Sequence, residues 1–502
     1  MSTRTFLLSL VTITTMPLSA AVMPPAIEDS DLTAYFLRVL EGEEPSQYTN
    51  DAKLTWQDVE SARTRVWEAW KAANQDYDAD LLPQLTPLAD SLTHSWLLPA
   101  ALEPTAKLPF FYGSKGDVRP TEGYPLFIYL HGSGAKEQEW STGFKLCKRF
   151  ADAPSAYFIP QIPNEGEYYR WWQKAKQYAW ERLLRLAMIS DDINPNQLYV
   201  FGISEGGYGS QRLASFYGDY WAGAGPMAGG EPLKNAPAEN CFNLAFNLRT
   251  GAEDTGFYRN TLTGYVQQNF KKLHTAEPDY YNYNVELLPG YGHAIPYDDT
   301  TPWLIKQPQR NPYPKYVAWE NFEMDGLKRH GFYNLWEEED PLQGKSGRVY
   351  YTLRIKDNHI DLIVRKVTYT VMESQDGIDL RFTKSYTTLN AGKVRVYLNE
   401  QLIDPAQPVT ITVNGHQGWN GMVEPTLTDM VNSVAGYYDS ERIYPASVLI
   451  DLANPTAIGD IRLDADDSAQ GSSLTYNLSG RIVPSDTSGV LITSSGSKIL
   501  RK

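Results

Sequence analysis

Short apolar runs alternate with amphipathic segments between residues 96 and 320. Continuous apolar or aromatic runs of this length are typical of strands that are buried on both faces of a sheet. Five such runs predict strands at 126–130, 156–159, 197–201, 244–248 and 285–288. An amphipathic helix is predicted over 168–188. Because strands separated by helices pair in parallel, this region is expected to have an α/β fold with a mostly parallel sheet.

The pattern changes near residue 345. From there β-branched and alternating runs follow one another without an intervening helix, and Asp376-Gly377 and Asn414-Gly415 supply turns between them. This predicts an all-β, sandwich-like domain over 345–454. The remaining tail, 455–502, is rich in Ser, Gly, Asp and Thr and has one strand-like stretch at 489–493.

The N-terminus has the pattern of an export signal. Arg4 precedes a mostly apolar stretch, and Leu18-Ser19-Ala20 offers a cleavage site, so residues 1–20 are expected to be a signal peptide. A helical extension is expected over 21–95. No later segment approaches 18 uninterrupted apolar residues, which predicts no stable membrane span. The mature protein is therefore expected to be periplasmic, cell-surface or extracellular.

Charge and cysteine content exclude several other classes. The formal net charge is −15, and no run of Lys and Arg suits a nucleic-acid backbone, so no nucleic-acid partner is expected. The chain has 2 cysteines, Cys147 and Cys241, which are too few for a disulfide scaffold and form no metal cluster. They could pair in an oxidising compartment, but buried free thiols are the expectation.

A candidate nucleophile lies directly after the third predicted strand. The motif Gly202-Ile203-Ser204-Glu205-Gly206-Gly207 separates that strand from a helix-like segment at 208–217. A serine at a sharp strand-to-helix turn needs glycines two positions away, because side chains there would collide. We therefore expect Ser204 to be a nucleophile.

A base and an acid follow in the order that this turn requires. His293 lies in a loop immediately after the last predicted strand, and Asp254 follows the strand before it. Glu253 on the same turn competes with Asp254 for the role of the acid. We expect His293 to activate Ser204 and Asp254 to orient His293.

Oxyanion donors are expected on two loops. His131-Gly132-Ser133-Gly134 follows the strand 126–130, so one backbone N–H should come from Gly132 or Ser133. The other should come from Glu205, the residue after the nucleophile. His131 is expected to support the loop rather than to act as a base.

With these motifs, residues 95–320 resemble secreted α/β-hydrolase esterases related to polyhydroxybutyrate depolymerases, feruloyl esterases and prolyl-oligopeptidase-type catalytic domains. The resemblance includes Asn194-Pro195-Asn196-Gln197-Leu198-Tyr199 before the turn and Ala222-Gly223-Ala224-Gly225-Pro226-Met227 after it. A second resemblance links residues 394–415 to β modules of putative esterases from Bacteroidota. The segments 476–482 and 498–502 are similar to type IX sorting domains of those bacteria, although 489–493 departs from their usual strand.

The expected chemistry is two-step acyl transfer on a carboxylic ester, without a metal or organic cofactor. Tyr169 and Trp172 follow the strand 156–159 and are expected either to stack on a sugar or aryl ester or to anchor the next helix in the core. A carbohydrate-linked ester is the leading substrate. The alternatives are a serine peptidase of the prolyl-oligopeptidase type and a non-catalytic glycan-binding surface protein. The β domain is expected to brace the enzyme, with glycan binding as the alternative.

Overall fold

The computed structural model describes residues 29–46, 48–50, 52–77 and 81–454 and, beyond them, four short strands. The predicted signal peptide lies outside the described residues. The chain forms two compact units that divide between Thr456 and Ala457. Among the helices of the described part, none combines the length and apolar character needed to cross a membrane.

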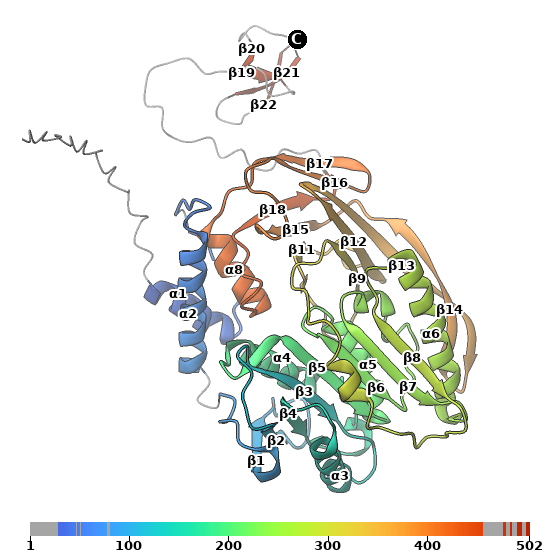
Figure 1. Cartoon of the computed structure of the whole chain (residues 1–502). Helices are drawn as coiled ribbons and strands as arrows, with labels where there is room; N and C mark the ends of the chain where they lie inside the picture. The colour runs from blue at the N-terminus through green and yellow to red at the C-terminus, as the bar shows by residue number, and fades with distance from the viewer. Residues whose placement is uncertain are drawn as a thin grey trace, which may run out of the picture. The chain divides into compact units, whose positions relative to one another are not determined.

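An eight-stranded sheet forms the centre of the first unit (Figure 1). Two strands, β1 (Thr93–Leu97) and β2 (Lys107–Lys115), are antiparallel at one edge. The other strands run parallel to one another in the order β4-β3-β5-β6-β7-β8. Their bounds are β3 (Tyr124–Leu130), β4 (Ser155–Pro160), β5 (Ile193–Ile203), β6 (Gly223–Met227), β7 (Ala245–Gly251) and β8 (Tyr283–Leu288). The predicted mixed α/β fold with a mostly parallel sheet is confirmed, and it is consistent with the α/β-hydrolase plan.

Both faces of this sheet are covered, which explains the continuous apolar runs. Every residue of β3 is buried. Leu126 and Ile128 pack in one cluster with residues of α4 and α5, whereas Phe127 and Tyr129 pack in another with residues of α3 and α7. The helices of this region are α3 (Lys136–Arg149), α4 (Lys174–Ile189), α5 (Glu205–Phe216), α6 (Arg259–Ala276) and α7 (Thr300–Leu304).

The predicted β region begins earlier than residue 345. The strand β9 (Tyr316–Asn321) lies at the end of the predicted α/β region, 96–320, but pairs with β12 (Arg348–Lys356). One sheet has the order β17-β16-β13-β12-β9 with β14 on β13, and a second has the order β10-β11-β15-β18. All of them belong to the same compact unit as the α/β sheet. The other bounds are β10 (Gly331–Phe332), β11 (Leu335–Glu339), β13 (His359–Gln375), β14 (Ile378–Thr388), β15 (Lys393–Leu398), β16 (Val409–Val413), β17 (His416–Gly421) and β18 (Ala446–Asp451).

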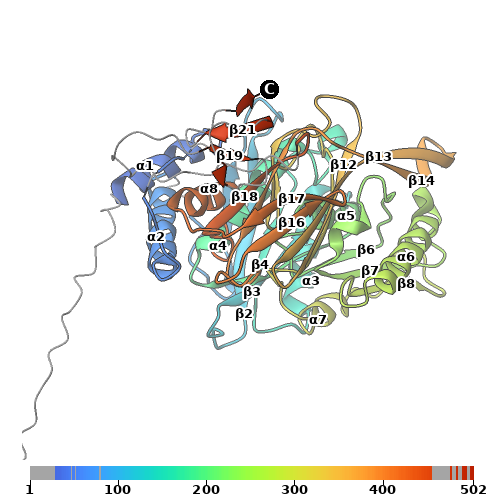
Figure 2. The same cartoon turned by 90° about the horizontal axis from the view of Figure 1, so that it is seen from above.

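The two N-terminal helices pack against a helix that lies at least 350 residues later in the sequence. Residues of α1 (Asp29–Leu40) and α2 (Val59–Tyr77) share an apolar cluster with α8 (Leu427–Tyr437). Trp70 is fully buried there against Phe36, with the two rings edge to face. Figure 1 and Figure 2 both show α1 and α2 beside α8, so the helices of the predicted N-terminal extension pack on the helix of the β region.

A buried network of charges joins the α/β sheet to the β region. Asp219, which follows α5, forms ion pairs with Arg329 and Arg442. Asp439 lies 2.7 Å from Arg442 and 2.7 Å from Arg310. All of these side chains except Arg329 are completely buried. Their charges therefore depend on one another for the stabilisation that water would otherwise provide.

The second unit contains four short strands. These are β19 (Thr475–Asn477), β20 (Ile482–Val483), β21 (Gly489–Thr493) and β22 (Lys498–Arg501), in the order β20-β19-β21-β22. The strand predicted at 489–493 is confirmed. A sorting role for this segment stays a prediction.

We predict that Asp219→Asn lowers the free energy of unfolding by about 3–5 kcal/mol, because Arg329 would lose its carboxylate and Arg442 one of its two carboxylates in a buried site. Denaturant unfolding followed by tryptophan fluorescence measures this change. Glu60→Gln is the control, since Glu60 pairs with Arg63 at the surface, where such pairs contribute about 0–1 kcal/mol. Equal effects of the two variants would contradict the prediction.

Candidate active site

Ser204 occupies the turn between β5 and α5 in a strained backbone conformation. Its φ is 56° and its ψ is −112°, a combination that non-glycine residues rarely adopt. The Ser204 N–H donates to the carbonyl of Met227 at 2.9 Å, which holds the turn in place. A Cβ on Gly206 would lie 1.9 Å from the Leu130 carbonyl oxygen, and one on Gly202 would lie 2.5 Å from the Gly206 carbonyl oxygen. The spacing of glycines in the motif is therefore required by close backbone contacts.

The structure brings together the three predicted residues of the triad. His293 Nε2 lies 3.0 Å from Ser204 Oγ, and His293 Nδ1 lies 2.8 Å from Asp254 Oδ2. With the proton on Nδ1, the imidazole donates to Asp254 and leaves Nε2 to accept the Ser204 proton. The His293 side chain is 45% exposed, whereas that of Asp254 is 2% exposed.

Asp254 is fixed by a residue that the sequence did not single out. Arg259, at the start of α6, donates to both carboxylate oxygens, from Nε at 2.8 Å and from Nη2 at 2.6 Å. Burial acts to raise the pKa of Asp254, but the hydrogen bonds from Arg259 and His293 outweigh it and hold that pKa below its usual value. Asp254 therefore stays ionised at neutral pH. Glu253, the alternative acid, is exposed to solvent.

The loop after β3 lies against Ser204. A Cβ on Gly132 would be 3.5 Å from the Ser204 Cβ. The Gly132 carbonyl accepts hydrogen bonds from Tyr169 Oη at 2.6 Å and from His131 Nδ1 at 2.8 Å. In a trans peptide the C=O and the following N–H point in opposite directions, so the Ser133 N–H is directed away from these donors. Among the described residues, no acceptor is found for the N–H of Ser133 or of Glu205.

His131 supports this loop, as predicted. It is completely buried, and its Nε2 accepts the Ile162 N–H at 3.1 Å. Burial lowers the pKa of His131 to about 4, so the ring is neutral at pH 7. Both ring nitrogens are occupied by backbone groups, which leaves neither to act on a substrate.

The two aromatic residues predicted to bind substrate differ in their positions. Tyr169 is 5% exposed and its hydroxyl donates a hydrogen bond to the Gly132 carbonyl. The expectation that it stacks on a substrate is therefore wrong in this structure. Its neighbour Trp172 lines a cavity beside Ser204 and has the Arg212 guanidinium 3.9 Å from its ring centre. Trp172 therefore stays a candidate for substrate contact.

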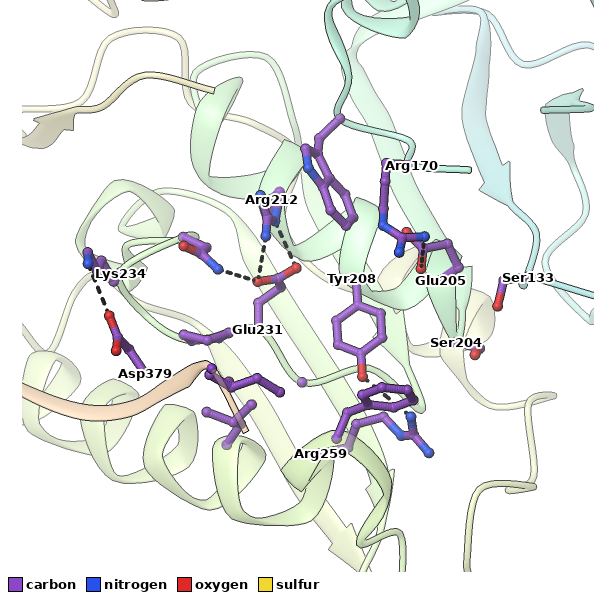
Figure 3. Close-up of a pocket in the computed structure, with 18 residues that line it drawn as sticks. Ser133, Arg170, Ser204, Glu205, Tyr208, Arg212, Glu231, Lys234, Arg259 and Asp379 are labelled. Carbon is purple, nitrogen blue, oxygen red and sulfur yellow. Dashed lines mark hydrogen bonds and ion pairs between the residues drawn. The ribbon is translucent and has the colours of Figure 1, made fainter. Parts of the chain in front are cut away.

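Two cavities meet at Ser204. The first has a volume of about 430 Å³ and contains Ser133, Ser204 and Glu205 in its wall (Figure 3). The second has a volume of about 700 Å³ and contains Ser133, Ser204 and His293. The first cavity also has charged residues that sequence reasoning missed, namely Arg170, Arg212, Glu231, Lys234, Arg259 and Asp379.

The described residues contain neither a metal-binding cluster nor a disulfide. Among the described residues, no group of three or more His, Cys, Asp or Glu side chains could hold a metal ion. Cys147 and Cys241 are both free and buried.

Comparison with known proteins gave similarity in structure alone. No family model and no curated protein matches the chain. Solved structures similar to 43% of the chain include a thermostable esterase, with 18% identity, a TM-score of 0.31 and 60% of its own length matched. They also include an S-formylglutathione hydrolase from Staphylococcus aureus (13% identity, TM-score 0.32, 98% of its length). A ferulic acid esterase from Anaeromyces mucronatus is similar as well (11% identity, TM-score 0.29, 90% of its length).

We predict that Glu205→Gln becomes more stable relative to the wild type as the pH rises. Burial raises the pKa of Glu205 to about 7, against a smaller opposing effect of Arg170. The stability that this group contributes is complete below its unfolded pKa of about 4.5 and is lost as the pH rises through 7. The difference in free energy of unfolding, variant minus wild type, should increase by about 3 kcal/mol between pH 4 and pH 8.

Chemical denaturation at several pH values measures this difference. Glu167→Gln is the control because Glu167 is exposed on the surface, and its difference from the wild type should stay constant. A constant difference for Glu205→Gln would show that its carboxyl group is not destabilised by burial.

Proposed function

We propose that this protein is a serine hydrolase that cleaves carboxylic esters through an acyl-enzyme on Ser204. The observation that carries the proposal is the continuous hydrogen-bond chain from Ser204 Oγ through His293 to a buried, ionised Asp254. Such a chain allows a hydroxyl group to lose its proton as it attacks a carbonyl carbon. No metal or organic cofactor takes part in this mechanism.

In the first step Ser204 Oγ attacks the ester carbonyl and its proton passes to His293 Nε2. Asp254 stabilises the resulting imidazolium through Nδ1. His293 then gives the proton to the leaving alcohol oxygen, which breaks the ester bond and leaves an acyl group on Ser204. A water molecule, deprotonated by His293, attacks this acyl group and restores the serine.

The oxyanion of each tetrahedral intermediate would be bound by two backbone N–H groups. Glu205 is the first residue of α5, so its N–H has no acceptor within the helix. Of the two residues left open by the sequence, Gly132 and Ser133, we propose Ser133 because the hydrogen bonds to the Gly132 carbonyl direct the Ser133 N–H away from the core. Each donor of this kind contributes about 3–4 kcal/mol to the transition state.

We propose that the substrates are acyl or feruloyl esters linked to carbohydrate. We also propose that the protein is exported from the cytoplasm. The exposed ring of Phe257 and the half-buried ring of Trp172 give the first cavity aromatic surface beside its charged groups. A screen of acetylated and feruloylated oligosaccharides, short acyl esters and peptides separates an esterase from a peptidase. A glycan-binding protein without activity would retain glycans and hydrolyse none of these compounds.

Replacement of the nucleophile tests the mechanism directly. We predict that Ser204→Ala reduces the kcat for 4-nitrophenyl acetate by about 10⁶-fold, to near the uncatalysed background, because no acyl-enzyme can form. Release of 4-nitrophenolate measures the rate. Equal rates in the variant and the wild type would sink the assignment of Ser204.

Two neighbouring carboxylates allow a matched test of the acid. We predict that Asp254→Asn reduces kcat by about 10⁴-fold, since His293 would no longer be held in the required tautomer. Glu253→Gln changes the preceding, exposed carboxylate and should keep nearly the full rate. If the Glu253 variant lost more activity than the Asp254 variant, the roles would have to be exchanged.

A further inference from the structure

The two cavities at Ser204 differ in whether His293 forms part of their wall. His293 must reach the leaving alcohol oxygen to protonate it, so the leaving alcohol lies on the His293 side. His293 lines the second cavity and is absent from the wall of the first. The acyl group, which stays on Ser204, is therefore directed into the first cavity.

A hairpin from the β region forms part of the wall of that first cavity. The strands β13 and β14 are joined by a tight turn at Asp376 and Gly377, whose φ values are 50° and 78°. Gly377, Ile378 and Asp379 line the cavity. Figure 3 shows the pair of Lys234 and Asp379 on the opposite side of the cavity from Ser204 and Ser133.

Three contacts fasten this hairpin to the α/β region. Lys234 Nζ lies 3.1 Å from Asp379, and the hydroxyls of Tyr258 and Tyr265 donate to Asp376 at 2.5 Å and to Glu373 at 3.3 Å. The contacts involve both strands and the turn. The hairpin is thus held as a fixed end to the cavity.

The remaining wall has apolar parts at Trp172, Phe257 and Leu262, and its charged groups are paired with one another. Arg212 binds Glu231 with two hydrogen bonds, of 2.7 Å and 3.1 Å, and packs on Trp172. Arg170 lies 3.3 Å from Glu205. An alkyl chain would displace water from these ion pairs without replacing its hydrogen bonds, whereas a hydroxyl group could both donate and accept.

We propose that the first cavity is the acyl site and that the β13–β14 hairpin limits acyl length there, so that short, hydroxyl-bearing acyl groups are favoured over long alkyl chains. The proposal rests on the proposed esterase function and adds a specificity determinant to it. Because the carbonyl carbon is held at Ser204, every added carbon moves the end of the acyl group toward Ile378 and the ion pair of Lys234 and Asp379.

Variants of Ile378 test the length limit. With 4-nitrophenyl esters from acetate to decanoate, the wild-type kcat/KM should fall steeply at the longer chains. Ile378→Ala removes bulk from the end of the cavity and should raise the ratio of octanoate to acetate kcat/KM by about tenfold. Ile378→Trp adds bulk at the same position and should lower this ratio by about tenfold.

Met372→Trp is the matched control, because Met372 is exposed on the same hairpin and does not line the cavity. It should keep the wild-type profile. If Ile378→Trp does not fold, Ile378→Ala still tests the proposal through the opposite shift. Chain-length profiles of the folded Ile378 variants that match the wild type would overturn the role of the hairpin.

A matched substrate pair tests the polar part of the proposal. The methyl esters of hexanoic acid and 6-hydroxyhexanoic acid differ by one hydroxyl group, and acid release can be followed by titration at constant pH. The hydroxylated ester should have the higher kcat/KM, by about tenfold. Equal values, or a preference for methyl hexanoate, would overturn this part. If the wild type hydrolysed no ester at all, the proposed esterase function itself would be wrong. If the enzymes were active but their chain-length profiles did not change, only the role of the hairpin would be wrong.

Discussion

The first turn of α5 lies against the end of β3 at a separation that leaves no room for a side chain at Gly206. The Leu130 carbonyl oxygen occupies the place where a Cβ would stand. This contact brings the loop after β3 beside the loop after β5, and these two loops carry Ser133 and Glu205, the two N–H donors that we propose for the oxyanion. It also accompanies the strained φ of Ser204, which turns the hydroxyl out of the sheet toward His293. The geometry of the site therefore follows from one backbone approach and from the glycines that permit it.

A second constraint acts at a distance from the site. The buried network around Asp219 and Asp439 ties the end of α5 to residues that follow α7, β9 and α8. Removing any one charge would take an ionic partner from at least one other buried or nearly buried charged group. The β region is thereby held in one position against the α/β sheet, and its hairpin is held at the end of the first cavity.

The sequence allowed prediction of the features that depend on local patterns. Short motifs and chain order predict three features: the strand-to-helix turn at Ser204, the acid and base after successive strands, and the buried parallel strands. The strand β6 was missed because its Gly-Ala-Gly-Pro sequence resembles a loop. In the structure Gly225 is required by the helix α7, since a Cβ there would lie 2.4 Å from the Thr300 side chain. Tyr169 and Trp172 could not be separated by sequence, because their burial depends on which of them reaches the Gly132 carbonyl.

Features that depend on long-range pairing were not accessible from sequence. The sequence of residues 316–321 suits a strand of the α/β sheet or of the β region equally well. Only its pairing with β12 shows that it belongs to the β region. Asp379 reaches the cavity only because a hairpin more than 100 residues beyond Asp254 folds back over α6. Arg259 combines a feature that the sequence predicts with one that depends on long-range contacts. Its spacing from Asp254 places it on the next helix, but its contact with both carboxylate oxygens and its place in the wall of the first cavity appear only in the folded chain. One guanidinium thus both fixes the acid of the triad and borders the proposed acyl site.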